Sequence, residues 1–248
     1  AKEHGTAPAA SWSDVYAIHL EIDTILKYLN DGEKVIDVGC ANGYSTVQFA
    51  SQKKIDIKGV DYIPEMIDQA KVRLSEISPN LLGSVTFDVD DIMKLKEPDN
   101  TYDKVIVIRV VINLESWENQ LAGLKECVRI LKPGGQFLLS EATLQGWKKL
   151  NQFRVEWGLS EIPIPSFNNY LDQEKVIDSL SASCKCKGVN NFSSAYFVGT
   201  RILKPLISES VKSKIDVAQP DMEWNRFWSM APAWGDYGTQ KLFIFEKK

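Results

Sequence analysis

The sequence predicts a doubly wound α/β fold for the first part of a chain of 248 residues. Helical and strand patterns alternate from Val35 to Ala142, which is typical of this fold class. Short runs without a polar face indicate strands buried on both sides, as in a parallel sheet. A glycine-rich loop joins the first of these strands to a helix, as it does in nucleotide-binding α/β domains.

The expected core elements follow one another in a regular order. Apolar residues at helical spacing predict a first helix over residues 11–30, which Asp31-Gly32 ends. Pro64 is tolerated in the first turn of a later helix, and Lys132-Pro-Gly-Gly135 is expected to form a turn. The other expected strands are 34–39, 55–61, 85–89, 102–111 and 136–142, and the other expected helices are 43–51, 64–77 and 117–131.

The pattern changes after residue 143. Residues 144–170 and 202–237 are rich in aromatic and turn-forming residues, so we expect them to form a helical and aromatic cap over the ligand edge of the sheet. Residues 187–197 and 240–246 are strand-like, and residues 204–217 look helical. We therefore expect one domain over 1–248, with a core at 33–143 and two inserted cap segments.

Composition excludes several classes of function. The net charge is −4 and the isoelectric point about 5.4, which argues against nucleic acid as the main partner. No apolar run is long enough for a membrane span, and residues 1–10 lack the pattern of a signal peptide. The C-x-C pair Cys184 and Cys186 does not make a zinc site by itself, so we expect no metal and reduced cysteines in a cytoplasmic protein. Oligomeric state is not indicated.

A loop with two glycines, Asp37-Val-Gly39-Cys40-Ala41-Asn-Gly43, follows the first strand and opens a helix. Glycines let the backbone turn tightly and approach a ligand closely. The loop is not G-x-G-x-x-G and no G-K-[ST] follows, which disfavours a dinucleotide or phosphate site. Asp37 places an anion beside the ligand and suits a cationic amino-acid group better than a pyrophosphate.

Acidic residues also end the next two strands. Asp61 lies roughly 20 residues beyond the loop, where a carboxylate can accept hydrogen bonds from ribose hydroxyls. Asp90 or Asp91 is a candidate acceptor for an adenine amino group, with Ile92 against the ring. The two aspartates compete for one role, and we prefer Asp91.

These segments together resemble the class I (Rossmann-like) S-adenosylmethionine-dependent methyltransferases. The resemblance covers residues 33–143 and is carried by 35–43, 59–61, 90–92, Tyr102-Asp103 and 129–135. It implies a seven-stranded, mostly parallel sheet with an antiparallel last strand, and S-adenosylmethionine as the cofactor with S-adenosylhomocysteine as its product. Ala41 departs from the family, which usually has a glycine there. The cofactor contacts that we expect are Trp12, Asp37, Gly39, Cys40, Ala41, Gly43, Asp61, Tyr62, Met66, Asp90, Asp91, Ile92 and Arg109.

The acceptor is expected to be a small molecule, methylated on oxygen or nitrogen. A hydroxyl acceptor needs a base, and Glu141 and His19 are the candidates; an ion-paired carboxylate and a polar-face histidine are the plainer interpretations. Arg201 is either an anchor for an anionic substrate or half of a surface ion pair. The candidate substrate contacts are Tyr16, Asn113, Asn168, Tyr170, Arg201 and Trp234. Aromatic residues 147, 157, 224, 227, 228 and 234 form either a substrate wall or the core of the cap.

Other classes of function remain alternatives. A protein or RNA methyltransferase needs a broad groove instead of a closed cap. A protein that binds the cofactor without catalysis would keep the loop and lack turnover. A nicotinamide-dependent oxidoreductase on a similar sheet is disfavoured because G-x-G-x-x-G is absent.

Overall fold

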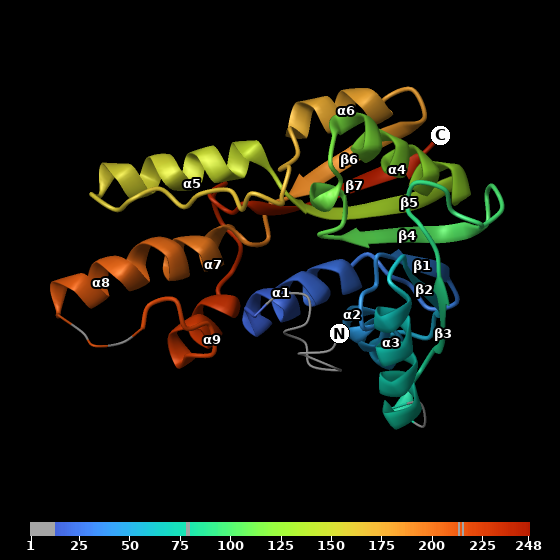
Figure 1. Cartoon of the computed structure of the whole chain (residues 1–248), viewed down its shortest axis with the longest axis horizontal. Helices are drawn as coiled ribbons and strands as arrows, with labels where there is room; N and C mark the ends of the chain where they lie inside the picture. The colour runs from blue at the N-terminus through green and yellow to red at the C-terminus, as the bar shows by residue number, and fades with distance from the viewer. Residues whose placement is uncertain (1–12, 78–79, 213, 215) are drawn as a thin grey trace.

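The computed structural model describes residues 13–77, 80–212, 214 and 216–248, and it contains one seven-stranded sheet (Figure 1). The strand order is β3-β2-β1-β4-β5-β7-β6, and β7 runs antiparallel to both of its neighbours. This confirms the predicted doubly wound, mostly parallel fold. The strands are β1 (Lys34–Val38), β2 (Asp56–Asp61), β3 (Ser84–Val89), β4 (Tyr102–Ile108), β5 (Leu131–Ala142), β6 (Cys184–Asn190) and β7 (Gln240–Lys247).

Helices cover both faces of the sheet. On one face, α4 (Trp117–Ile130) and α6 (Gln173–Leu180) contribute to a large apolar cluster with the strands. On the other face, α1 (Val15–Leu26) and α2 (Tyr44–Gln52) pack against the sheet, and α3 (Pro64–Ile77) packs beside α2 and β3. The remaining elements are α5 (Leu144–Glu156), α7 (Ser194–Val198), α8 (Lys204–Ser210), α9 (Glu223–Ser229), the 3-10 turn η3 (Val111–Asn113) and the π turn η4 (Gly199–Leu203).

The central strands are largely apolar in their middle because both of their faces are buried. In β4, Val105 and Val107 point into the cluster beneath α4, whereas Ile106 and Ile108 point into the cluster beneath α1. Successive side chains of a strand alternate between faces, so a strand between two helical layers needs no polar positions. The strand that we predicted at 102–111 ends earlier, at Ile108.

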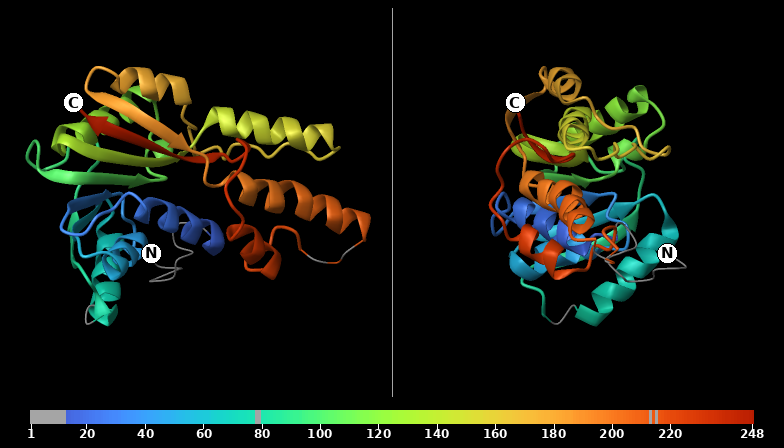
Figure 2. Two further views of the ribbon diagram at one scale, coloured as in Figure 1. Left: turned by 180° about the vertical axis from the view of Figure 1, so that it is seen from behind. Right: turned by 90° about the vertical axis from the view of Figure 1, so that its left-hand side faces the viewer.

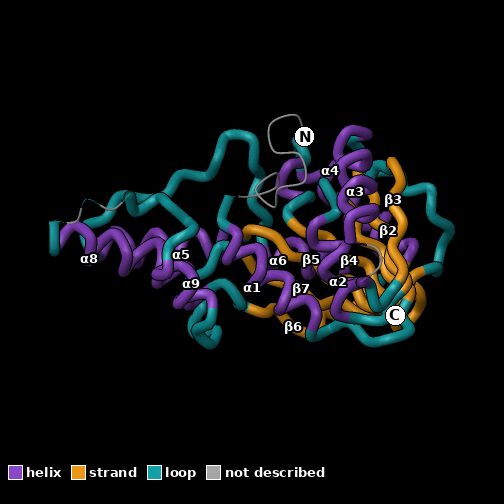
Figure 3. Tube along the Cα trace, turned by 90° about the horizontal axis from the view of Figure 1, so that it is seen from below, coloured by secondary structure: helices purple, strands orange, loops and turns teal. Residues whose placement is uncertain are grey.

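The order of strands reverses between β1 and β4, and a ligand of such a sheet binds outside the carboxyl ends of the strands at this point. The loop after β1 and the turn after β4 therefore lie side by side. Beyond the carboxyl edge of the sheet, α5, α8 and α9 extend away from the core (Figures 2 and 3). These helices form the cap. Within the described residues, no helix is long and apolar enough to cross a membrane.

The strand that we expected over 187–197 is wrong in its second half. Pairing with β7 ends at Asn190, the chain turns, and α7 begins at Ser194. All five residues of α7 are buried. A short helix that is buried on every side shows no helical periodicity, so its apolar run cannot be told from a strand. The chain continues from α7 through η4 into α8, which ends at Ser210 although we expected a helix to residue 217.

Candidate active site

The loop after β1 adopts left-handed backbone geometry at three positions: Gly39 (φ 79°), Ala41 (φ 48°) and Gly43 (φ 71°). A Cβ atom on Gly39 would lie 2.2 Å from Cγ2 of Val110 in the turn after β4. Glycine at this position therefore allows the two turns to approach each other. Ala41 adopts a conformation that glycine adopts without cost, so the departure from the family pattern leaves local strain in the loop.

Asp37 lies at the end of β1 with its side chain buried. Its Oδ2 accepts a hydrogen bond from Thr46 Oγ1 at 2.6 Å, and its Oδ1 is buried without a hydrogen-bond partner among the described residues. Burial raises the pKa of Asp37 to about 7, the Thr46 hydroxyl lowers it, and the carboxylates of Asp61 and Glu21 raise it further. A buried acceptor atom without a donor fits a cationic group such as the ammonium of S-adenosylmethionine.

Asp61 ends β2 and faces the same loop. Its Oδ2 accepts from the backbone N–H of Ala41 and its Oδ1 from that of Ile63, both at 2.9 Å. Burial raises the pKa of Asp61, and these two backbone bonds lower it. Each carboxylate oxygen can accept a second hydrogen bond, so this geometry leaves capacity for the ribose hydroxyls that we expected here.

The two competing aspartates after β3 differ in burial. Asp90 is buried, and its two oxygens accept from the backbone N–H groups of Asp91 and Lys96 at 2.9 and 3.0 Å. Asp91 is exposed, and among the described residues its carboxylate accepts only from the N–H of Met93, at 2.9 Å. Asp90 therefore stabilises the turn, whereas the exposed carboxylate of Asp91 has capacity for further hydrogen bonds.

Arg109 follows β4 in left-handed geometry (φ 55°) and lies between two cavities. Its Nε lies 3.2 Å from Oε2 of Glu21 on α1. Glu21 is almost fully buried and also accepts hydrogen bonds from Ser140 Oγ and from Gln240 Nε2, the latter at 3.0 Å. Burial raises the pKa of Glu21, and Arg109 lowers it. The ends of β4, β5 and β7 are thereby tied to α1.

Glu141 is fully buried and supports the turn that follows Arg109. Its Oε1 accepts from the backbone N–H groups of Val110 and Val111 at 2.7 and 2.6 Å. Burial raises the pKa of Glu141 to about 8, although these two bonds lower it. The side chain does not line either cavity. We expected Glu141 beside the ligand edge of the sheet. The side chain lies at that edge, but it bonds to the backbone of the turn after β4.

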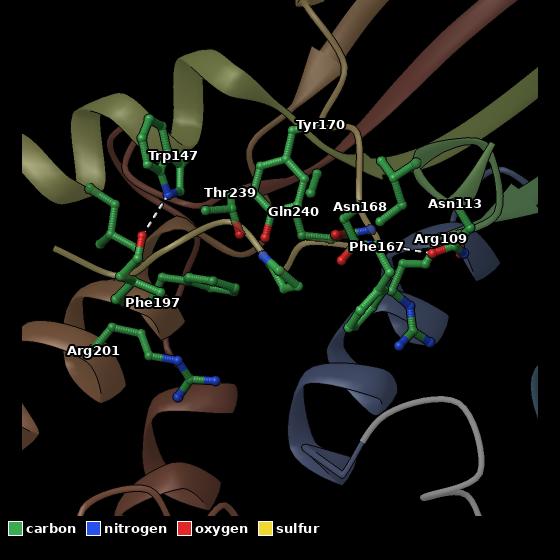
Figure 4. A pocket seen from close by; sticks show the side chains of 15 residues that line it. Arg109, Asn113, Trp147, Phe167, Asn168, Tyr170, Phe197, Arg201, Thr239 and Gln240 are labelled. Carbon is green, nitrogen blue, oxygen red and sulfur yellow. Dashed lines mark hydrogen bonds between the residues drawn. The ribbon is translucent and has the colours of Figure 1, made fainter. Parts of the chain in front are cut away.

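A cavity of about 360 Å³ lies between α5, the segment that follows it, and the helix formed by α7 and η4 (Figure 4). A second, small cavity of about 30 Å³ lies in the loop after β1 and is lined by Asp37, Gly39, Ala41 and Arg109, among others. Arg109 borders both, so the larger cavity opens beside the cofactor loop. The larger cavity is lined by Arg109, Ile112, Asn113, Ala142, Trp147, Leu150, Ile162, Pro165, Phe167, Asn168, Tyr170, Phe197, Arg201, Thr239 and Gln240.

Four of the candidate substrate residues line this cavity: Asn113, Asn168, Tyr170 and Arg201. Asn168 Nδ2 donates to Asn113 Oδ1 at 2.7 Å, and Asn113 Nδ2 donates to the carbonyl of Arg109 at 2.9 Å. This chain of amides connects the cap to the turn after β4. Of the aromatic residues that we considered for a substrate wall, Trp147 lines the cavity, whereas Trp224 and Trp228 pack against each other in the cap.

Among the other expected site residues that the structure describes, Cys40 lines the small loop cavity, whereas Tyr16, His19, Tyr62, Met66 and Trp234 line neither cavity. Tyr16 packs against the apolar cluster of the cap, Trp234 is half exposed, and Tyr62 is 70% exposed. His19 is exposed and stacks on Tyr44, with its Nε2 2.6 Å from the tyrosine hydroxyl. Met66 lies partly buried in the first turn of α3, and Cys40 is buried in the loop. Trp12 lies outside the described residues.

Sequence reasoning missed Glu21 and Gln240. A signal for Glu21 was present, because it lies on the apolar stripe formed by Ile18, Ile22 and Ile25 of the first helix. A carboxylate in such a stripe needs a buried partner. No local pattern indicates Gln240, because it reaches the site only through the pairing of β7 with β5.

Comparisons with known proteins agree with this geometry. Residues 35–135 match the family described as a methyltransferase domain. An uncharacterized methyltransferase of Schizosaccharomyces pombe is 32% identical over 124 residues, which cover 48% of this chain and 44% of that protein. Norajmaline N-methyltransferase of Rauvolfia serpentina is 28% identical over 216 residues, which cover 84% of this chain and 65% of that protein.

A solved structure shares the fold. Magnesium protoporphyrin IX methyltransferase of Synechocystis PCC 6803, with bound SAH, superposes with a TM-score of 0.61 at 15% identity, over 95% of this chain and 86% of that one. The chain spans less than half the length of several curated relatives that it matches. Residues 35–135 therefore match a methyltransferase domain, and the chain shares its fold with a methyltransferase whose structure contains SAH.

Proposed function

We propose that this chain transfers a methyl group from S-adenosylmethionine to an oxygen or nitrogen of a small-molecule acceptor. The observation that carries the proposal is the cavity of about 360 Å³, which shares Arg109 with the cofactor loop. Sites for small molecules are concave, largely apolar and commonly about 300–1,000 Å³ in volume. A protein or an RNA acceptor would need a broader groove.

The acidic residues at or just after the carboxyl ends of β1, β2 and β3 fit the cofactor in three parts. Asp37 would receive the ammonium group, Asp61 the ribose hydroxyls, and Asp91 with Ile92 the adenine. The bound cofactor supplies an electrophilic methyl group on a sulfonium. The chain's own task is to align the acceptor with that group and to exclude water from it.

The walls of the cavity are suited to this task. Trp147 is fixed by a hydrogen bond from its Nε1 to the carbonyl of Ile162 at 2.7 Å, and Phe167 and Tyr170 lie on the same side as Asn168 (Figure 4). Aromatic side chains offer large apolar surfaces that hold a ligand in few orientations. The amides of Asn113 and Asn168 add directional polar contacts.

The two candidate bases take different roles in this proposal. Glu141 is a positioning residue, since it holds the backbone of Val110 and Val111 and does not reach the cavity. His19 contacts Tyr44, which lines the small loop cavity, so it supports the cofactor side of the site. Tyr16, Trp12 and Trp234 remain predictions as contacts, and so does a cytoplasmic location.

The relatives support the class of acceptor. The name of the Rauvolfia protein assigns it N-methylation of norajmaline, and its alignment extends over 84% of this chain. The alternatives, a macromolecular acceptor or cofactor binding without catalysis, predict different products.

The test is transfer of label from S-adenosylmethionine with a tritiated methyl group, incubated with the chain and, separately, with small-molecule, protein and RNA fractions of a cell extract. Label in the small-molecule fraction, abolished by excess S-adenosylhomocysteine, is the expected result. Label in protein or RNA would refute the proposal in favour of a macromolecular acceptor. Cofactor binding without transfer to any fraction would favour a binding protein.

A further inference from the structure

Arg201 is held at the wall of the acceptor cavity by an irregular turn of helix. The continuous helix from Ser194 to Ser210 contains the π turn Gly199–Leu203, and such turns recur at functional sites. The turn is tightly packed, because Trp224 Nε1 donates to the carbonyl of Gly199 at 2.9 Å and a Cβ atom on Gly199 would lie 2.0 Å from Trp228. Phe197 and Arg201, one on each side of Gly199, both line the cavity.

Among the residues that the structure describes, a carboxylate engages only one nitrogen of the Arg201 guanidinium. Its Nη2 lies 2.8 Å from Oδ2 of Asp14, and the guanidinium carbon lies 5.4 Å from the centre of the Phe197 ring. Asp14 is buried, and its other oxygen accepts from the Tyr196 hydroxyl at 2.5 Å and from the N–H of Ala17. Arg201 is thus oriented from one side, and its Nε and Nη1 retain donors for a ligand.

Two further cationic side chains, Arg154 and Lys204, interact with Arg201. Arg154 donates a hydrogen bond from Nη1 to the carbonyl of Arg201. Burial, and then the charge of Arg201, lower the pKa of both Arg154 and Lys204. Asp14 and the carboxylates of Asp216 and Asp221 act on Lys204 in the opposite direction. A bound anion would relieve this repulsion.

A second arginine lines the same cavity. Arg109 supplies a second guanidinium, which Figure 4 shows at the other end of the lined space from Arg201. No carboxylate side chain lines the cavity in the part of the chain that the structure describes. Between the two arginines lie aromatic and aliphatic side chains, among them Phe197, Phe167 and Ile112.

We infer that the methyl acceptor carries an oxyanion, a carboxylate or a phosphate, which Arg201 binds at the end of the cavity far from the cofactor loop. This inference rests on the proposed function. The anion would fix one end of the acceptor, the apolar walls would hold its body, and the reacting atom would then lie near Arg109, where the two cavities meet. Arg201 would therefore determine specificity without touching the reacting atoms.

The test measures binding of paired small probes in the presence of saturating S-adenosylhomocysteine, by calorimetry or ligand-observed NMR. Benzoate and phenyl phosphate are the anions, and benzamide and phenyl methanesulfonate are their neutral counterparts. We expect at least one anion to bind about tenfold more tightly than its counterpart. Hydrogen bonds to charged groups contribute about 1.4 kcal/mol more than neutral ones, and this difference corresponds to a tenfold change in affinity. The anion with the larger ratio identifies the group.

Three variants make the test specific. Arg201→Gln removes the guanidinium, and the double variant Asp14→Asn/Arg201→Gln removes it without leaving a buried carboxylate unpaired. Arg226→Gln is the matched control, because Arg226 is exposed on α9 and pairs only with Glu223 among the described residues. The preference for the anion should disappear in both Arg201 variants and persist in the control.

The outcomes separate this inference from the proposed function. Equal affinity for both members of each pair, no measurable binding of any probe, or a preference that survives in both Arg201 variants would overturn the oxyanion site. Failure of the folded wild-type chain to bind S-adenosylhomocysteine would instead refute the proposed function.

Discussion

Replacement of Asp37 by asparagine is predicted to stabilise the chain and to weaken cofactor binding. The amide oxygen can still accept the Thr46 hydroxyl bond that Oδ2 now accepts. The NH2 group then takes the place of Oδ1, which is buried without a partner among the described residues. The change removes a buried charge and puts a donor where the ligand's ammonium needs an acceptor.

The effect on stability follows from the pKa of Asp37, which burial raises from 3.8 to about 7. Because the folded state holds the proton more tightly, the stabilisation is complete below pH 3.8 and is lost as the pH rises through 7. Three pKa units correspond to about 4 kcal/mol, which is an upper estimate for one group. Asp37→Asn should avoid this loss, so its free energy of unfolding should exceed that of the wild type at pH 8 and vary less with pH.

The effect on binding has the opposite sign. Loss of a charged acceptor for an ammonium costs about 1.5–3 kcal/mol, which is a roughly 10- to 150-fold weaker affinity for S-adenosylhomocysteine. The wild type should also release protons on binding near pH 7, because the ammonium favours the ionised carboxylate. The variant should release fewer.

Urea unfolding at pH 5 and pH 8 measures the stability, and calorimetric titration in two buffers of different ionisation enthalpy measures affinity and proton release. Asp23→Asn is the matched control, since Asp23 is exposed on α1. A variant that is destabilised at pH 8 and still binds the ligand as tightly as the wild type would refute the reasoning.

Substitutions of three further carboxylates should separate stability from binding. Glu141→Ala leaves the N–H groups of Val110 and Val111 without their acceptor and should cost about 2–6 kcal/mol in urea unfolding, whereas Glu141→Gln keeps a carbonyl there and should cost far less. Asp90→Ala should lower the free energy of unfolding by about 1–3 kcal/mol, whereas Asp91→Ala should preserve it and weaken S-adenosylhomocysteine binding about tenfold by calorimetry. Equal unfolding costs for both Glu141 variants, or full affinity in Asp91→Ala, would contradict these assignments.

The edge of the sheet at which we expect the cofactor could be predicted from sequence, because Asp37 and Asp61 lie at the carboxyl ends of their strands and Asp91 lies just after the end of β3. Asp37, Asp61 and Asp91 are separated widely along the chain, yet the carboxyl ends of parallel strands meet at one edge. The order of strands, and therefore the proximity of these residues, follows from the fold class alone.

The acceptor side depends on contacts that no local pattern specifies. Gln240 reaches Glu21 only because β7 inserts between β5 and β6, and Arg201 reaches the cavity through a π turn that leaves no periodic signal. Burial on every side also concealed the helix over Ser194–Val198. Aromatic and turn-forming content still indicated Asn168 and Tyr170 as part of the cap, and Arg201 was a candidate anchor for an anionic substrate. No pattern indicated which of these side chains face inward.

The most direct test of the central claim is calorimetric titration of the folded chain with S-adenosylmethionine and S-adenosylhomocysteine, in parallel with Asp61→Ala. The account predicts that both ligands bind the wild type at a single site. It also predicts that Asp61→Ala loses most of this affinity, because the acceptors for the ribose hydroxyls are gone, while its unfolding remains cooperative. Absence of binding of either ligand to the folded wild type would contradict the claim that the loop after β1 holds this cofactor.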